Sequence, residues 1–120
     1  MIDKSGYIVN RKRDDLKRRA AALRAERAKS AYQATSNADE IAGIRAKVEA
    51  KKAALLAELA AATTADAMKP IIDKFWKYNG IGSIFGDLER LEARDAAKEY
   101  PSVESYRRAA DGIAAALENL

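Results

Sequence analysis

The sequence contains no cysteine and no histidine. The absence of cysteine excludes a disulfide framework and any chemistry that depends on a thiolate. The absence of histidine removes the commonest general base at neutral pH and the commonest protein ligand of transition metals. Among the residues that remain, no catalytic motif, metal-ligand set or nucleotide-binding loop stands out. We therefore expect no catalytic residues, no metal, no cofactor and no small-molecule substrate.

Residues that interrupt helices are also scarce, since the 120 residues include two prolines and six glycines. Between Arg11 and Ala62 there is no proline and a single glycine, Gly43, in a stretch made mostly of alanine, arginine, lysine and glutamate. Alanine and the long charged residues have the highest intrinsic helix propensities. The stretch therefore predicts long helices, and no part of the chain shows a convincing strand pattern.

Long apolar runs are missing as well. The first residues, Met1 to Gly6, do not form the apolar core of a secretory signal, and no segment reaches the length needed to span a membrane. Together with the lack of cysteine, these absences predict a cytoplasmic protein of a bacterium, or of a phage acting inside one. We expect no membrane partner.

Two long helices are expected in the first half of the chain. The first begins near Asn10, a good N-cap residue, and runs to about Ala34, followed by a turn over residues 35–37. Asn37 and Glu40 resemble a capping box, which indicates that the second helix opens there and runs to about Ala62. Because the turn between the helices is short, we expect an alanine-rich antiparallel helical hairpin over residues 10–62, similar to a short coiled coil.

Three shorter helices are expected in the second half. Pro70 fits the first turn of the third helix, and Asn79–Gly80 is a typical C-cap. Ser83 can cap the fourth helix, and the fifth occupies roughly residues 102–118, after the break at Pro101. Six of the eight aromatic residues lie at or after residue 75, so the bulky part of the core is expected in this half.

The predicted fold class is all-α. An N-terminal arm over residues 1–9 precedes the hairpin over residues 10–62, and a compact three-helix C-terminal bundle over residues 63–120 follows. We expect the three parts to form one cooperative domain.

The second helix carries two apolar faces. At about 100° per residue, Ile41, Val48 and Leu55 fall on one side, which we assign to the core. Alanine occupies the opposite side, where a solvent-exposed helix more often carries charge: Ala46, Ala50, Ala53 and Ala57. Such alanines either support an exposed helix or allow a close packing partner. Their heptad-like spacing favours packing on another chain, which is either a second copy or a foreign protein.

Charge is distributed unevenly. Residues 1–52 contain 14 basic and 7 acidic residues, whereas residues 53–120 contain 8 basic and 11 acidic residues. The first part therefore has a net charge of +7 and the second a net charge of −3. Such an asymmetry is typical of a basic element that binds phosphate or an acidic protein surface.

The basic residues of the first helix form the first candidate surface: Arg11, Arg13, Lys17, Arg18, Arg24 and Arg27. Four of them share one stripe that could follow a phosphate backbone. No aromatic residue is interleaved to stack on bases, and no helix-turn-helix or zinc pattern accompanies them. We therefore favour an acidic protein partner over nucleic acid. A solvated helix face, with acidic residues interleaved, is the simplest alternative.

Trp76 and Tyr78 form the second candidate surface, together with the four alanines above. Both aromatic residues diverge from the apolar stripe of the third helix, so they are candidates for contact with a protein partner. The neighbouring run from Asn79 to Gly86 superficially resembles a glycine-rich phosphate loop, but it follows a helix rather than a strand. Further on, carboxylates between residues 87 and 99 alternate with Arg90, Arg94 and Lys98, which predicts a solvated, ion-paired face.

These features predict a non-catalytic helical interaction protein. We expect an adaptor or an inhibitor, of the kind found among phage and mobile-element accessory factors, with a protein partner or self-association. One alternative is a nucleic-acid-binding protein that uses the basic first helix. The other is a structural subunit of a larger assembly, such as a virion component.

Overall fold

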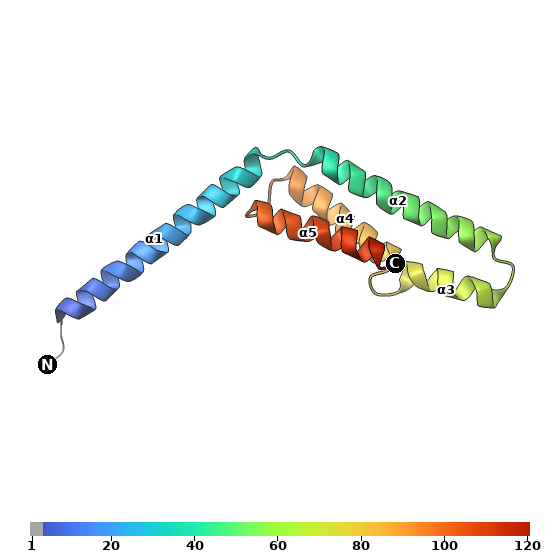
Figure 1. The fold of residues 1–120 in the computed structure, drawn as a ribbon, viewed down its shortest axis with the longest axis horizontal. Coiled ribbons are helices and arrows are strands. Elements are labelled where there is room, and N and C mark those ends of the chain that lie inside the picture. The colour runs from blue at the N-terminus through green and yellow to red at the C-terminus, as the bar shows by residue number, and fades with distance from the viewer. Residues whose placement is uncertain (1–3) are drawn as a thin grey trace.

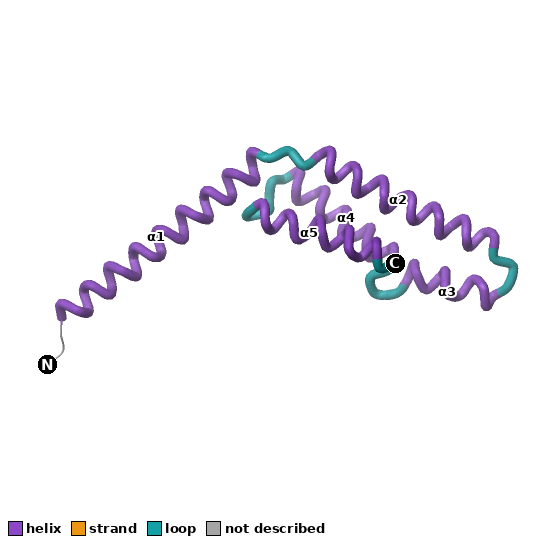
Figure 2. Tube along the Cα trace, viewed as in Figure 1, coloured by secondary structure: helices purple, strands orange, loops and turns teal. Residues whose placement is uncertain are grey.

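In the computed structural model, the backbone is described from Lys4 to Leu120 and the side chains from Val9 onward. Every regular element in this part of the chain is a helix, as Figure 2 shows, so the predicted all-α class is confirmed. The five helices are α1 (Lys4–Ala34), α2 (Ala38–Ala61), α3 (Ala65–Trp76), α4 (Ile81–Ala96) and α5 (Val103–Glu118).

The expected hairpin is wrong. In the described residues α1 packs against α5 and not against α2, and it extends away from the rest of the molecule as a long arm (Figure 1). The molecule therefore measures 84 × 36 × 18 Å. The apolar stripe of α2 is covered by α4 and α5 instead, whose buried Leu and Ile side chains stabilise this packing by removing apolar surface from water.

Helices α2, α4 and α5 form the bundle, and α3 packs on α2 and α4. The bundle therefore includes the second helix that we had assigned to the hairpin. Ile41, Val48 and Leu55 face its core, as their spacing predicted. The other buried hydrophobic residues are Tyr32, Ile81, Ile84, Leu88, Leu91, Tyr100, Tyr106, Ala110 and Ile113.

Several helix boundaries differ from those expected. Helix α1 begins at Lys4, well before Asn10, so that only residues 1–3 of the expected arm lie outside the described residues. Helix α3 begins before Pro70, because the hydroxyl of Thr64 caps it by accepting a hydrogen bond from the Ala67 amide. Helix α4 begins at Ile81 rather than after Ser83. The short turn before it requires Gly80, since a Cβ there would lie 2.6 Å from the carbonyl oxygen of Lys74.

The junction between α1 and the bundle is a packed elbow built on three tyrosines. Tyr32, near the end of α1, is fully buried. Its ring centroid lies 5.7 Å from that of Tyr100 and 6.0 Å from that of Tyr106. The first pair meets edge to face, an arrangement that aromatic rings favour. The end of α1 is therefore held in the core, although the rest of the helix projects into solvent.

A buried carboxylate closes the elbow. Asp95 of α4 is 8% exposed, and its Oδ1 atom accepts hydrogen bonds from the hydroxyl of Tyr32 and the side-chain amide of Asn37, both at 2.8 Å. Burial, reinforced by the bond to Asp95, raises the pKa of Tyr32, so its hydroxyl stays protonated and remains a donor. The three side chains tie together α1, the α1–α2 turn and α4.

The predicted capping box does not form. The side chain of Asn37 makes no capping bond to α2 because it donates to Asp95 instead. The carboxylate of Glu40 accepts the hydroxyl of Tyr106 at 2.6 Å and is paired with Arg107 at 3.0 Å. The two residues of the expected local motif therefore join α2 to α4 and to α5.

Replacing Tyr32 by phenylalanine tests the elbow. Tyr32→Phe removes one of the two donors to the buried Asp95 carboxylate, and a poorly satisfied buried carboxylate costs about 1–3 kcal/mol. We expect the free energy of unfolding, measured by urea denaturation, to fall by this amount. Tyr78→Phe is the matched control, because Tyr78 is 89% exposed, and it should leave stability unchanged. Equal stability of the unmodified chain, Tyr32→Phe and Tyr78→Phe would show that the hydrogen bond from Tyr32 to Asp95 does not stabilise the fold.

A second prediction concerns pH. The hydrogen bonds from Tyr106 and Arg107 lower the pKa of Glu40 below its ordinary value of 4.5. These bonds therefore stabilise the fold above that pH, and their contribution is lost as the pH falls through the lowered pKa. In urea denaturation at a series of acidic pH values, Glu40→Gln should show a weaker loss of stability than the unmodified chain. If the stability of the two proteins fell in parallel with decreasing pH, the ionised carboxylate of Glu40 would contribute nothing to the acid dependence of stability.

Candidate interaction surfaces

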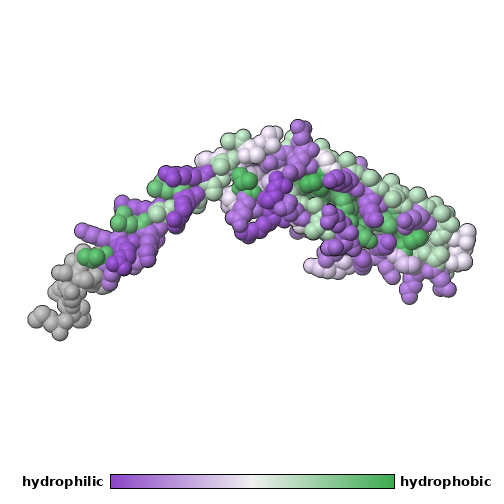
Figure 3. Space-filling view, viewed as in Figure 1, coloured by the Kyte–Doolittle hydropathy of each residue, from purple (hydrophilic) through white to green (hydrophobic). Residues whose placement is uncertain are grey.

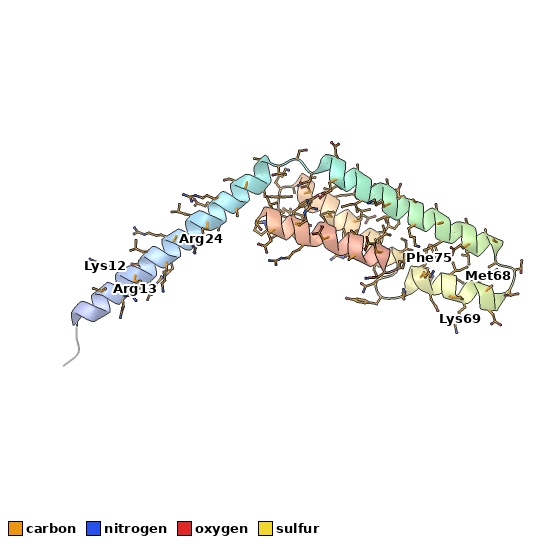
Figure 4. The ribbon with its side chains drawn as sticks, in the orientation of Figure 1. Lys12, Arg13, Arg24, Met68, Lys69 and Phe75 are labelled. Carbon is orange, nitrogen blue, oxygen red and sulfur yellow. The ribbon has the colours of Figure 1, made fainter. Side chains whose placement is uncertain are left out.

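The arm formed by α1 has the largest net positive charge of the five helices. Its 31 residues include ten basic and three acidic side chains, a net charge of +7. All six basic candidates, Arg11, Arg13, Lys17, Arg18, Arg24 and Arg27, are exposed. Figure 4 shows Lys12, Arg13 and Arg24 pointing from the helix into solvent. Among the side chains described on the arm, one ion pair forms, between Arg18 and Asp15 at 3.8 Å, so the charge is largely uncompensated.

An apolar stripe runs along the same helix. Val9, Leu16 and Leu23 are 57%, 65% and 52% exposed, and their spacing of seven residues places them on one face. Figure 3 shows separate apolar patches along the hydrophilic surface of the arm. We call these three residues the arm stripe. Arg13 and Arg27 lie on or beside it at helical geometry, so apolar and positively charged groups share one face.

The alanine face of α2 is exposed. Ala46, Ala50, Ala53 and Ala57 all lie on the side of α2 that faces solvent, opposite the buried Val48 and Leu55. The prediction that another chain packs here stays a prediction, because an exposed alanine face suits both a docking surface and a simple helix-stabilising role.

The aromatic turn between α3 and α4 is the most exposed apolar feature. Trp76 is 84% exposed and Tyr78 is 89% exposed. Trp76 also borders a hollow of about 340 Å³ between α2, α3 and α4, lined by the half-buried rings of Phe75 and Phe85. The ammonium group of Lys52 lies 5.1 Å from the centroid of Phe85. Large aromatic side chains at the edge of a hollow are typical of protein-binding positions.

The aromatic turn and the attachment point of the arm lie at opposite ends of α4. The aromatic turn precedes Ile81, whereas the elbow that holds the arm lies at Asp95. At 1.5 Å per residue the two ends of the helix are about 20 Å apart, and the arm leads away from the bundle (Figure 1). The structure therefore does not combine the predicted site residues into one site.

The acidic run of α4 is divided among different roles. Asp87 pairs with Arg90 at 3.1 Å on the surface, as predicted. Glu92 is joined to Arg45 of α2, and this partner lowers the pKa of Glu92. A carboxylate held ionised in this way is unsuited to donate a proton at neutral pH. Asp95 is the exception to the predicted solvated face, since it is buried in the elbow.

No protein-family model, curated protein or solved structure matches this chain. No helix in the described part is long and apolar enough to cross a bilayer. Residues 4–120 also contain no cluster of acidic side chains arranged to hold a metal ion.

The single tryptophan allows a direct test of the aromatic turn. With 84% of Trp76 exposed, the folded protein should emit at the wavelength of a solvated indole. We expect almost no shift on unfolding in urea, and equal acrylamide quenching before and after. N-acetyltryptophanamide provides the reference. A blue-shifted emission that moves to the red on unfolding would show that the indole is covered in solution.

Proposed function

We propose that this protein is a non-catalytic adaptor that docks its α1 arm lengthwise on an acidic protein. The observation that carries the proposal is the arm itself, a 31-residue helix that projects from the bundle beyond the elbow, with a net charge of +7 and an exposed apolar stripe. The bundle folds around α2, α4 and α5 without using this surface. We propose a bacterial cytoplasm, or the cytoplasm of a phage-infected cell, as its location.

The arm stripe favours protein over nucleic acid. Fully burying one leucine side chain contributes about 1.5–3 kcal/mol, and a groove that receives one face of a helix provides such burial. A phosphate backbone offers no apolar surface to Leu16 or Leu23. The flanking arginines would then pair with carboxylates at the rim of the groove, which supplies specificity and speeds association.

Self-pairing through the arm stripe is disfavoured. If two arms lay side by side in parallel, with Val9, Leu16 and Leu23 in the seam, the next seam positions would be Lys12 and Arg19. Each of these cations would then face its own copy. An acidic partner avoids this repulsion.

The elbow supports docking because it fixes the arm in advance. Tyr32 anchors α1 through Tyr100, Tyr106 and Asp95. A partner therefore does not have to immobilise the root of the arm, and the entropic cost of binding is reduced. The aromatic turn at the other end of α4 provides a second contact, which is the reason for proposing an adaptor.

Nucleic acid binding is the second candidate, favoured by one observation. The ten basic residues of α1 are spread around the helix and exceed its acidic residues by seven. Such a helix binds phosphates through charge alone, and its affinity falls steeply with salt.

Two sets of arm variants separate the candidates. In the first, Leu16→Ala and Leu23→Ala remove the stripe while keeping helix propensity. In the second, Arg13→Glu, Lys17→Glu and Arg24→Glu reverse the charge. Leu56→Ala is the matched control, because Leu56 is a 47% exposed leucine on α2. Each protein is immobilised, exposed to bacterial lysate at two salt concentrations with and without nuclease, and tested for what it retains.

Docking on an acidic protein predicts a nuclease-resistant partner that both sets of arm variants lose and Leu56→Ala retains. Loss after nuclease treatment, with the leucine variants binding normally, would instead establish nucleic acid as the ligand. Retention of the same partner by all variants would place binding outside the arm.

A further inference from the structure

A groove whose lining includes no residue of α1 runs between α4 and α5, which lie side by side in the bundle. Its hollow has a volume of about 350 Å³. Its floor is formed by small or apolar residues of α5 and by Tyr100. Three arginines from two helices line it, and we call it the arginine groove: Arg90, Arg94 and Arg108.

The charge of the groove is not balanced by its own residues. Asp87 is the single carboxylate among the described residues that line it, and it pairs with Arg90. Arg108 pairs with Glu104 at 2.7 Å, but this pair is exposed and such pairs are weak. Two positive charges in excess therefore remain on the lining.

Arg94 stands out among the three arginines. Its guanidinium carbon lies 4.3 Å from the centroid of Tyr100. No carboxylate in the described part of the chain lies within 4 Å of it, and none of the hydrogen bonds formed there uses its N–H groups. Stacking on the ring fixes a planar cation and leaves its donors available for a ligand.

Two features of the groove reduce the stability of the fold. Arg90 and Arg94 are one helical turn apart on α4. Like charges at this spacing repel each other. Gly112, on the floor, adds to the cost, since glycine inside a helix is less stable than alanine. A Cβ built at this position meets nothing within 4 Å, so the space above Gly112 is open.

We propose that the arginine groove binds an acidic amphipathic helix of a protein partner. The carboxylates of that helix pair with Arg90, Arg94 and Arg108, and an apolar side chain enters the space above Gly112. A third helix fits a groove between two packed helices because ridges of side chains fill the furrow between them. This proposal concerns a surface apart from the arm and does not depend on the function proposed for it.

Nucleic acid fits the groove less well. Tyr100, the aromatic ring on its floor, is 4% exposed and covered by Arg94. It therefore offers no open face for a base to stack on. The apolar side chains of Ile113 and Ala116 match an apolar anchor and not a phosphate.

A synthetic peptide provides the probe. A fluorescent helix built from alanine, leucine and glutamate, with glutamates one turn apart along one edge, is titrated with the full-length protein and followed by polarisation. The same peptide with glutamine in place of glutamate is the charge control, and a single-stranded oligonucleotide is the third ligand. All titrations are repeated with the arm variant Arg13→Glu, Lys17→Glu, Arg24→Glu, so that binding to the arm is distinguished from binding to the groove.

Two variants alter the groove, one on α5 and one on α4. Gly112→Leu fills the open space, and because it replaces a glycine inside a helix the protein should unfold at the same or a higher temperature. Arg94→Gln removes the stacked cation. Gly43→Leu is the matched control, since Gly43 lies inside α2 and a Cβ there also meets nothing within 4 Å.

We expect the glutamate peptide to bind the unmodified chain and the arm variant alike, and the glutamine peptide to bind at least about tenfold more weakly. Gly112→Leu and Arg94→Gln should each weaken the glutamate peptide by about tenfold or more, whereas Gly43→Leu should not. Equal affinity for the two peptides, or unchanged binding by Gly112→Leu, would overturn the proposal. So would an oligonucleotide that binds more tightly than the peptide and is lost with Arg94→Gln.

Discussion

The side chain of Asp95 lies buried at one end of the bundle, where its Oδ1 atom accepts both the hydroxyl of Tyr32 and the side-chain amide of Asn37. A buried carboxylate is costly unless it is well hydrogen-bonded. Both donors come from the segment that joins α1 to α2, so satisfying the carboxylate also fixes that segment. The direction of α1, and with it the exposure of the arm, follows from this requirement.

The helices differ in whether their apolar faces are buried in the core or exposed on the arm. The bundle takes the apolar faces of α2, α4 and α5 for its core. The arm is left with basic residues and the three residues of its stripe, which no described part of the chain covers. The aromatic turn and the arginine groove are lined by residues of the bundle and by none of α1. The molecule therefore separates a stable body from surfaces that remain free to bind.

Local sequence signals predicted part of the local structure, whereas the starts of α1, α3 and α4 and the capping box at Asn37 were wrong. The all-α class, the core face of α2 and the exposure of Trp76 and Tyr78 all followed from periodicity and capping. The pairing of helices could not be predicted, because α1 and α4–α5 compete for the same stripe of α2 and sequence spacing does not weigh the areas they bury. Tyr32 lies in line with alanines of α1, a pattern that indicates a packing face but does not identify Tyr100 and Tyr106 as its partners. The arginine groove was missed because its cations come from two helices, and along α4 alone they resemble a surface paired with its own carboxylates.

The length of the arm also affects how the protein moves through solution. Its radius of gyration is 23.1 Å, whereas a globular chain of this length would have one of about 14 Å. Friction with solvent depends on shape as well as mass, so a single chain of 13.1 kDa will diffuse slowly and elute from a sizing column ahead of globular proteins of equal mass. A monomer could thus be mistaken for a dimer, and mass must be measured by a method that does not depend on shape, such as light scattering.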